Sequence, residues 1–214
     1  SNKHEGVVHS SNLCTEILLH TKSSKYNKGE KTETGETAVC NLASVNLKSH
    51  LTQGSDGIYQ LDWNKLSSTI SVAMRGLDNV VDLNFYPTKE AENSNMKHRP
   101  VGLGVMGLHD VLHKLNIQID SEEAKNFNDK LFEFYSKCAI LSSSKLAKER
   151  GSYSSYEGSL WSQDQLPIDT YNNLLEYRGS TKISYDEKGW QECRNHIKEY
   201  GMRNSNVMAI APTA

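Results

Sequence analysis

Two long stretches of helical periodicity, separated by strand-like runs, constrain the fold of this chain most strongly. Between Asp62 and about Asn84, apolar residues recur every three or four positions, so we expect a helix with one buried stripe and with Asp62 as its N-cap. The stripe is expected to contain Trp63, Leu66, Ile70, Ala73, Leu77 and Val80. Ser121 should open the longest helix, and Gly151 should end it. The alternation of helices with strand-like runs predicts an α/β fold with mainly parallel strand pairing.

The segments between these helices are shorter. Residues 22–36 are polar and lack periodicity, which predicts an exposed loop, and Pro87 should interrupt the first helical pattern. The expected strands are 16–20, 37–42 with a continuation to Leu47, 99–105 and 206–211, and further helices are expected at 106–112, 167–175 and 186–200. No repeat or linker subdivides residues 1–214, so we expect a single domain.

The charge balance and the cysteines argue against several classes of protein. Lys and Arg number 24 against 26 acidic residues, a net charge of −2, which does not favour a nucleic-acid-binding surface. No apolar run is long enough to predict a membrane span. None of the cysteines forms a C-x-x-C pair, so no metal site is predicted, and their small number is typical of a reduced, cytoplasmic protein. They are Cys14, Cys40, Cys138 and Cys193.

The segment 11–17, S-N-L-C-T-E-I, is the most informative one for chemistry. If it is extended, alternate side chains share a face, so Asn12, Cys14 and Glu16 would present an amide, a thiol and a carboxylate to one small volume. Leu13, Thr15 and Ile17 would face the other way and anchor the segment. The alternative is a buried apolar cysteine beside a surface glutamate, and the pattern leaves both interpretations open.

Two further segments carry candidate residues. Cys40, in a second strand-like run, is either a redox thiol or an ordinary core cysteine. A strand that ends in small residues before a helix is a good seat for a phosphate, because the free N–H groups of the helix start favour an anion. Thr213 and Ala214 follow the last strand-like run in this way, although no helix follows them in this sequence.

Taken together, these segments resemble the large, catalytic subunit of class I ribonucleotide reductases. The resemblance rests on S-N-L-C-x-E-I at 11–17, A-V-C-N-L at 38–42 and P-T-A at 212–214. Similar stretches are R-P-V-G-L-G-V at 99–105, L-A-K-E at 146–149 and Y-G-M-R-N-S at 200–205, so that the similarity runs through nearly the whole chain.

The resemblance implies a role for each candidate residue. Cys14 would become a thiyl radical that removes the 3′ hydrogen of the substrate ribose. Glu16 would accept the proton of the 3′ hydroxyl, and Asn12 would hydrogen-bond the ribose hydroxyls. Cys40 would be one of two cysteines that supply reducing equivalents and end as a disulfide. Thr213 and Ala214 would begin the loop that binds the substrate phosphates. The apolar surroundings of the loop are expected to keep water from Cys14.

The resemblance also implies a fold and a set of partners. The family fold is a ten-stranded α/β barrel, and residues 1–214 would form the finger loop and much of the second half-barrel. The N-terminal nucleotide-binding cone, where ATP and dNTP effectors bind, the thiol partner of Cys40 and the C-terminal tail would be missing. We therefore expect an incomplete barrel domain without activity of its own. The implied partners are a ribonucleoside diphosphate, a metal-containing small subunit that supplies the radical, thioredoxin or glutaredoxin, and the missing portions of the same subunit. No cofactor would bind this chain directly.

Two competing interpretations remain. Residues 102–107 form a literal G-x-G-x-x-G, which could indicate a nicotinamide- or flavin-dependent oxidoreductase. The acidic residue expected about 20 positions later is not matched, since Asp120 follows Gly107 too closely, and a tight strand-to-helix turn explains the glycines better. The chain could also be a scaffold that has lost catalysis, but intact Asn12, Cys14, Glu16 and Cys40 argue against that.

Overall fold

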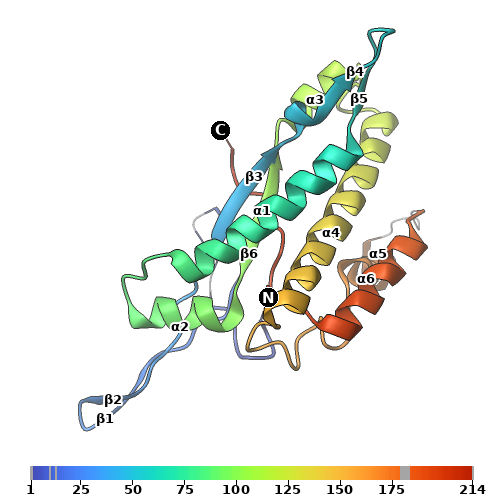
Figure 1. Cartoon of the computed structure of the whole chain (residues 1–214). Coiled ribbons are helices and arrows are strands. Elements are labelled where there is room, and N and C mark those ends of the chain that lie inside the picture. Colours follow the sequence, from blue (N-terminus) through green and yellow to red (C-terminus); the bar gives the residue numbers. More distant parts are fainter. Residues whose placement is uncertain (1, 10, 13, 179–183, 214) are drawn as a thin grey trace.

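The core of the molecule is a short parallel sheet. The computed structural model describes residues 2–9, 11–12, 14–178 and 184–213. Strands β3 (Asn41–Asn46) and β6 (Val101–Met106) pair in parallel along their whole length (Figure 1). The other edge of β6 is flanked by residues 206–209, which run parallel to it and form one bridge, between Leu103 and Met208. Three chain segments therefore run side by side in the same direction.

Helices cover one face of this sheet. Helix α1 (Trp63–Leu83) lies across β3 and β6, α4 (Glu122–Arg150) packs beside it, and α6 (Glu187–Tyr200) packs on α4 (Figure 1). No helix among the described residues combines the length and apolar character that crossing a membrane requires. The other elements are β1 (Lys25–Asn27), β2 (Glu30–Glu33), the 3-10 helix η1 (Leu47–His50), β4 (Leu51–Gln53), β5 (Tyr59–Leu61), α2 (Lys89–His98), α3 (Leu108–Lys114) and α5 (Pro167–Arg178).

The helix boundaries confirm the signals in the sequence. The Asp62 and Ser121 side chains accept hydrogen bonds from the first-turn amides of α1 and α4, at 2.9 and 3.1 Å, and Gly151 ends α4. The phase of the α1 stripe differs by one residue toward its C-terminal half. Met74 and Val81 are buried there, while Val80, assigned to the stripe, is exposed.

Several local assignments were wrong. Residues 22–36 contain the exposed antiparallel hairpin β1–β2, and a second hairpin, β4–β5, and helix α2 had no clear periodicity to reveal them. The strand expected from residue 37 begins only at Asn41, and the one expected from residue 99 begins at Val101. Residues 206–211 form a single bridge because the segment leaves the sheet edge after Ala209. The strand expected at 16–20 has one isolated bridge, at Leu18.

The predicted α/β class is confirmed, and its core pairing is parallel as expected, whereas the two hairpins are antiparallel. The described residues form no closed barrel. They form two barrel-type strands joined by the crossover helix α1, which is the unit that an α/β barrel repeats.

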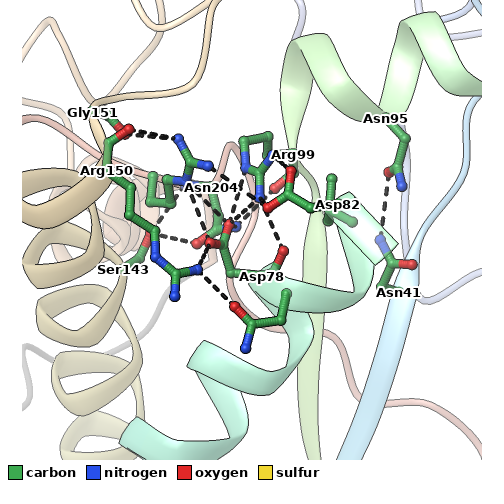
Figure 2. Close-up of polar contacts among 12 residues, drawn as sticks. Asn41, Asp78, Asp82, Asn95, Arg99, Ser143, Arg150, Gly151 and Asn204 are labelled. Atoms are coloured by element: carbon green, nitrogen blue, oxygen red, sulfur yellow. Dashed lines mark hydrogen bonds and ion pairs between the residues drawn. The ribbon is translucent and has the colours of Figure 1, made fainter. Parts of the chain in front are cut away.

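A buried ion cluster fastens one end of this unit together (Figure 2). Asp78 of α1, with no exposed surface, accepts hydrogen bonds from Arg99 at 2.8 and 3.0 Å, from Arg150 at 2.8 Å and from Arg203 at 3.3 Å. The Asn204 amide also donates to Asp78. These partners come from the end of α2, the end of α4 and the start of residues 202–213, called the last segment below, so one carboxylate joins three distant parts of the chain.

A second polar cluster holds the N-terminal segment in place. Glu36 is buried and accepts hydrogen bonds from Lys97, at 2.9 Å, and from His98. Lys97 also binds Glu5 at 2.5 Å, and His98 contacts the Ser155 hydroxyl at 2.6 Å. The N-terminal segment, which includes Cys14, is thereby held against the end of α2.

This second cluster predicts a loss of stability in acid. Burial lowers the pKa of His98, although Glu36 opposes the shift. Burial alone would raise the pKa values of Glu5 and Glu36, but their bonds to Lys97, and for Glu36 also to His98, lower both. The unfolded chain therefore binds more protons than the folded chain, first at His98 below about pH 6.5 and then at the carboxylates below about pH 4.5.

We expect the free energy of unfolding to fall as pH decreases from 7 to 4, as measured by urea titration at each pH. Glu36→Gln should flatten the part of the curve below pH 4.5, because it removes one of the carboxylates that titrate there. A flat wild-type profile over this range would contradict the prediction.

Candidate active site

The candidate residues of segment 11–17 lie on a tight turn. Ser11 and Leu18 form an antiparallel bridge, and between them the Thr15 amide donates to the Asn12 carbonyl at 3.2 Å. Thr15 has a φ of 65°, in the left-handed region. The extended conformation assumed from the sequence is therefore wrong, and alternation along a strand does not explain the site.

Asn12 and Glu16 meet nonetheless, because they face each other across the turn. The Asn12 amide donates to Glu16 Oε1 at 2.5 Å, and Asn12 Oδ1 accepts from the Ile17 amide at 3.3 Å. Ile17 is buried and anchors the turn as expected, whereas Thr15 is exposed and does not. Leu13 lies outside the described residues.

Cys14 projects from the tip of this turn and is exposed. The expected apolar enclosure of Cys14 is therefore wrong for this chain by itself, because the described residues build no wall around the tip. The turn presents its thiol outward, where a second surface could cover it.

One oxygen of Glu16 is left without a partner. Oε1 accepts the Asn12 bond, but Oε2 is buried and no described residue donates a hydrogen bond to it. Leaving a buried acceptor unsatisfied costs about 1–3 kcal/mol, and more for a charged group. Such an orphaned oxygen marks a position where a ligand hydroxyl could donate.

Cys40 lies near this carboxylate, just before β3. Burial, assisted by the negative charge of Glu16, raises the pKa of Cys40 to about 12. The side chain is therefore a neutral thiol at pH 7, which suits a donor of hydrogen better than a nucleophile. Asn12 and Glu16 are thus in contact, the charge of Glu16 reaches Cys40, and Cys14 is exposed at the tip of the turn.

The last segment approaches Cys40 across β6. A Cβ placed on Gly102 would lie 3.6 Å from Cys40 Sγ and 2.7 Å from Ala209 Cβ, so the thiol and Ala209 flank the same glycine. Thr213 follows Ala209 by four residues, which limits the distance between their Cα atoms to about 14 Å. Thr213 is exposed, and Ala214 lies outside the described residues.

The G-x-G-x-x-G pattern does not form a dinucleotide-binding loop. Gly102 and Gly104 lie inside β6, whereas a Rossmann loop would place them after the strand. Gly107, with a φ of 74°, caps the short helix α3. This confirms the strand-to-helix turn favoured from the sequence.

The remaining cysteines belong to the helical layer. Cys138 contacts Ser67 of α1 at 3.6 Å, and Cys193 is buried in α6 with its pKa raised to about 12 by burial. Neither lies in the strand segments that gather around Cys40. Within the described residues, no three His, Cys, Asp or Glu side chains converge as metal ligands would.

Sequence reasoning missed the neighbours that bring the site together. Gly102, Gly104 and Ala209 determine how closely the last segment passes Cys40, and the only signal in the sequence was the pair of alternating glycines in a strand-like run. Asp78 was also missed as a buried centre, although an acidic residue beside the apolar stripe of α1 was a hint.

The candidate residues lie on an α/β scaffold, and comparison with known proteins places this chain in a family. Residues 1–214 match the family described as "Ribonucleotide reductase, barrel domain". The chain belongs to the ribonucleotide reductase family, by its match to the barrel domain.

The relatives support the same assignment. The chain is 53% identical over 214 residues to the ribonucleoside-diphosphate reductase subunit alpha of Chlamydia pneumoniae, covering 99% of this chain and 19% of that protein. It is 38% identical to the large chain from Neurospora crassa, covering 100% and 21%, and 38% identical to the large subunit from Monkeypox virus, covering 98% and 24%. The chain thus spans about a fifth to a quarter of the length of these relatives.

Proposed function

We propose that this chain is the part of a ribonucleoside-diphosphate reductase large subunit that carries the radical cysteine and one reducing thiol. The whole subunit would convert ribonucleotides to deoxyribonucleotides for DNA synthesis. Residues 1–214 would form part of one barrel domain. The rest of that barrel, the nucleotide-binding cone and the C-terminal tail would belong to other parts of the subunit.

The orphaned Glu16 oxygen carries this proposal. Oε2 is buried and accepts no hydrogen bond from the described residues, while Oε1 is held by Asn12, so the carboxylate is oriented to accept one more hydrogen bond from a bound molecule. The 3′ hydroxyl of a ribose supplies such a donor. With the hydroxyl at Glu16, the neighbouring 3′ C–H would face the Cys14 turn.

The side chains then divide the chemistry among them. The Cys14 thiyl radical takes the 3′ hydrogen atom, Glu16 accepts the 3′ hydroxyl proton, and the C2′ hydroxyl leaves as water. Cys40 and a second thiol outside this chain give two electrons and two protons and close to a disulfide. Cys14 returns its hydrogen to C3′ and Glu16 returns its proton to the 3′ oxygen, so the sum is ribonucleotide plus dithiol to deoxyribonucleotide plus disulfide plus water. The raised pKa of Cys40 keeps its proton available for this transfer.

Binding and regeneration would involve partners. Thr213 and Ala214 would begin the seat of the substrate phosphates, where backbone amides favour an anion. A metal-containing small subunit would supply the oxidising equivalent for Cys14, so that this chain would bind no cofactor itself. Thioredoxin or glutaredoxin would reopen the disulfide by thiol exchange, which fits a reducing compartment such as the cytoplasm. ATP and dNTP effectors would bind the cone.

The test is deoxyribonucleotide formation by the whole subunit containing this segment, supplied with its small subunit, a ribonucleoside diphosphate and a dithiol. We expect product with the diphosphate and a kinetic isotope effect when the 3′ position carries deuterium. Absence of product in the complete mixture, or product without an isotope effect at any substrate concentration, would argue against the proposed role of Cys14 and its neighbours.

Glu16→Gln should lower turnover of this assembly by about 10²–10⁴-fold, because general acid–base catalysis contributes roughly that much and glutamine cannot accept a proton. Fold should persist, since glutamine can keep the bond from Asn12. Steady-state kinetics measure the effect, and Glu157→Gln, at an exposed position, is the control. Equal turnover of the Glu16 and Glu157 variants would contradict the assigned role.

A further inference from the structure

Gly102 and Gly104 of β6 lie on the face of the sheet where Cys40 approaches Gly102. Side chains alternate along a strand, and Val101, Leu103 and Val105 are buried in the core beneath α1 and α4. Gly102 and Gly104 therefore turn toward the opposite face. They oppose Leu42 and Ser44 of β3 in register, so that bare backbone lies at the centre of this face.

The last segment uses this bare backbone to change its course. Leu103 donates to the Val207 carbonyl at 3.0 Å, and Ala209 donates to the Leu103 carbonyl at 3.4 Å, so the segment follows the edge of β6 up to Ala209. A Cβ on Gly104 would then lie only 2.4 Å from the Ala209 carbonyl oxygen and 3.4 Å from the Ile210 Cα. The chain passes over the Gly104 position just after it leaves the edge.

The two glycines differ in what a side chain would displace. At Gly102 the nearest atoms are Leu42 Cδ2, at 2.5 Å, and Ala209 Cβ, at 2.7 Å, which are side-chain atoms. At Gly104 the nearest atom belongs to the Ala209 backbone. A methyl group at 104 must therefore move the main chain that leads to Thr213. One at 102 could be accommodated if the Ala209 methyl were removed and the exposed Leu42 side chain changed its rotamer.

We propose that Gly102 and Gly104 are positioning residues. They let the 209–213 segment cross onto the face of the sheet where the Cys40 side chain lies against Gly102, and so place the phosphate-binding end at a fixed distance from the reducing thiol. This inference rests on the proposed function for its consequence, but its geometry concerns this chain alone. Gly104 would set the path of the segment, and Gly102 would set the contact between the segment and the Cys40 neighbourhood.

The test compares alanine variants of the whole subunit in the reductase assay. Gly104→Ala should raise the KM for a ribonucleoside diphosphate about tenfold to a hundredfold, as displacements near 1 Å do, while kcat changes much less. Gly102→Ala should show a smaller defect, and the double variant Gly102→Ala, Ala209→Gly should recover wild-type kinetics. The same Ala209→Gly change should not rescue Gly104→Ala, because the carbonyl oxygen remains.

Gly76→Ala is the matched control, because Gly76 lies on the exposed side of α1 with no atom within 4 Å of the added Cβ. It should leave KM and kcat unchanged. Unchanged kinetics of Gly104→Ala, equal losses of kcat and folded protein in both strand variants, or rescue of Gly104→Ala by Ala209→Gly would overturn the proposal.

A second measurement separates this proposal from the proposed function. Site-resolved mass spectrometry gives the alkylation rate of Cys40 in the same folded proteins without any turnover. Gly102→Ala should change that rate at least threefold or so, the double variant should restore it, and Gly76→Ala should not affect it. If the wild type proves inactive as a reductase while these rates follow the expected order, the proposed function fails and the positioning stands. Equal Cys40 rates in all variants would overturn the positioning whatever the activity.

Discussion

Changing Cys14 to serine should stop deoxyribonucleotide formation by the whole subunit, with a loss of about 10³-fold or more, as expected when a residue that reacts directly with substrate is removed. A serine O–H bond is much harder to oxidise to a radical than a thiol S–H bond, so the 3′ hydrogen would stay in place. Because Cys14 is exposed at the tip of a turn, the substitution should not change the fold.

Two further measurements test whether the loss is specific to Cys14. Cys138→Ser, which changes a thiol in the helical layer in contact with Ser67, should retain turnover. The Cys14→Ser subunit should still bind a ribonucleoside diphosphate with wild-type affinity, as measured by calorimetry. Normal product formation by Cys14→Ser would remove Cys14 from the mechanism, and loss of activity in both variants would point to damage of the fold.

The sequence predicted that Asn12 and Glu16 would lie together, but the structure gives a different reason for it. Asn12 and Glu16 were expected on one face because a strand alternates its side chains. They meet because a turn with a left-handed Thr15 folds the chain back on itself. Asn12 and Glu16 share a face in an extended strand and meet across a tight turn, so their spacing alone could not distinguish the two conformations. In the turn, Cys14 lies at the exposed tip.

Helix termini were predictable because their signals are local. Asp62, Ser121 and Gly151 act on amides and carbonyls within a few residues of themselves. Hairpin β4–β5 was missed because its strands are only three residues long, too short for a period to register. The strand predicted for residues 206–211 was too long. The point at which this segment leaves β6 depends on Gly104, a residue 105 positions away from Ala209.

Long-range polar contacts could not be predicted from the sequence either, because they join residues far apart in the chain. Nothing local pairs Asp78 with Arg99, Arg150 and Arg203, which are up to 125 positions distant. The stretches R-P-V-G-L-G-V and Y-G-M-R-N-S contributed to the resemblance as strings. The structure adds a physical reason for their arginines, because both bind the same buried carboxylate (Figure 2 shows the Arg99 contact).

Asp78→Ala should therefore lower the free energy of unfolding of the chain by about 3–5 kcal/mol, the usual cost of removing one partner from a buried ion pair. Arg99 is only 3% exposed, and its guanidinium would keep Asp82 as its sole carboxylate partner among the described residues. Arg150 and Arg203 would lose the same acceptor, and the start of the last segment would lose its attachment to α1. Asp78→Asn should cost less, because an amide oxygen can still accept a hydrogen bond.

Asp82→Ala is the matched control, since it removes a carboxylate that binds the same Arg99 at 2.7 Å but is 40% exposed. Solvent screens that pair, so its loss should cost only about 1 kcal/mol or less. Urea denaturation followed by circular dichroism gives both values, provided the slope with denaturant is the same in the variants. If Asp78→Ala is unfolded without urea while Asp82→Ala is folded, the order of effects is as expected. Equal midpoints for the two variants would mean that Asp78 is not the centre on which this end of the fold depends.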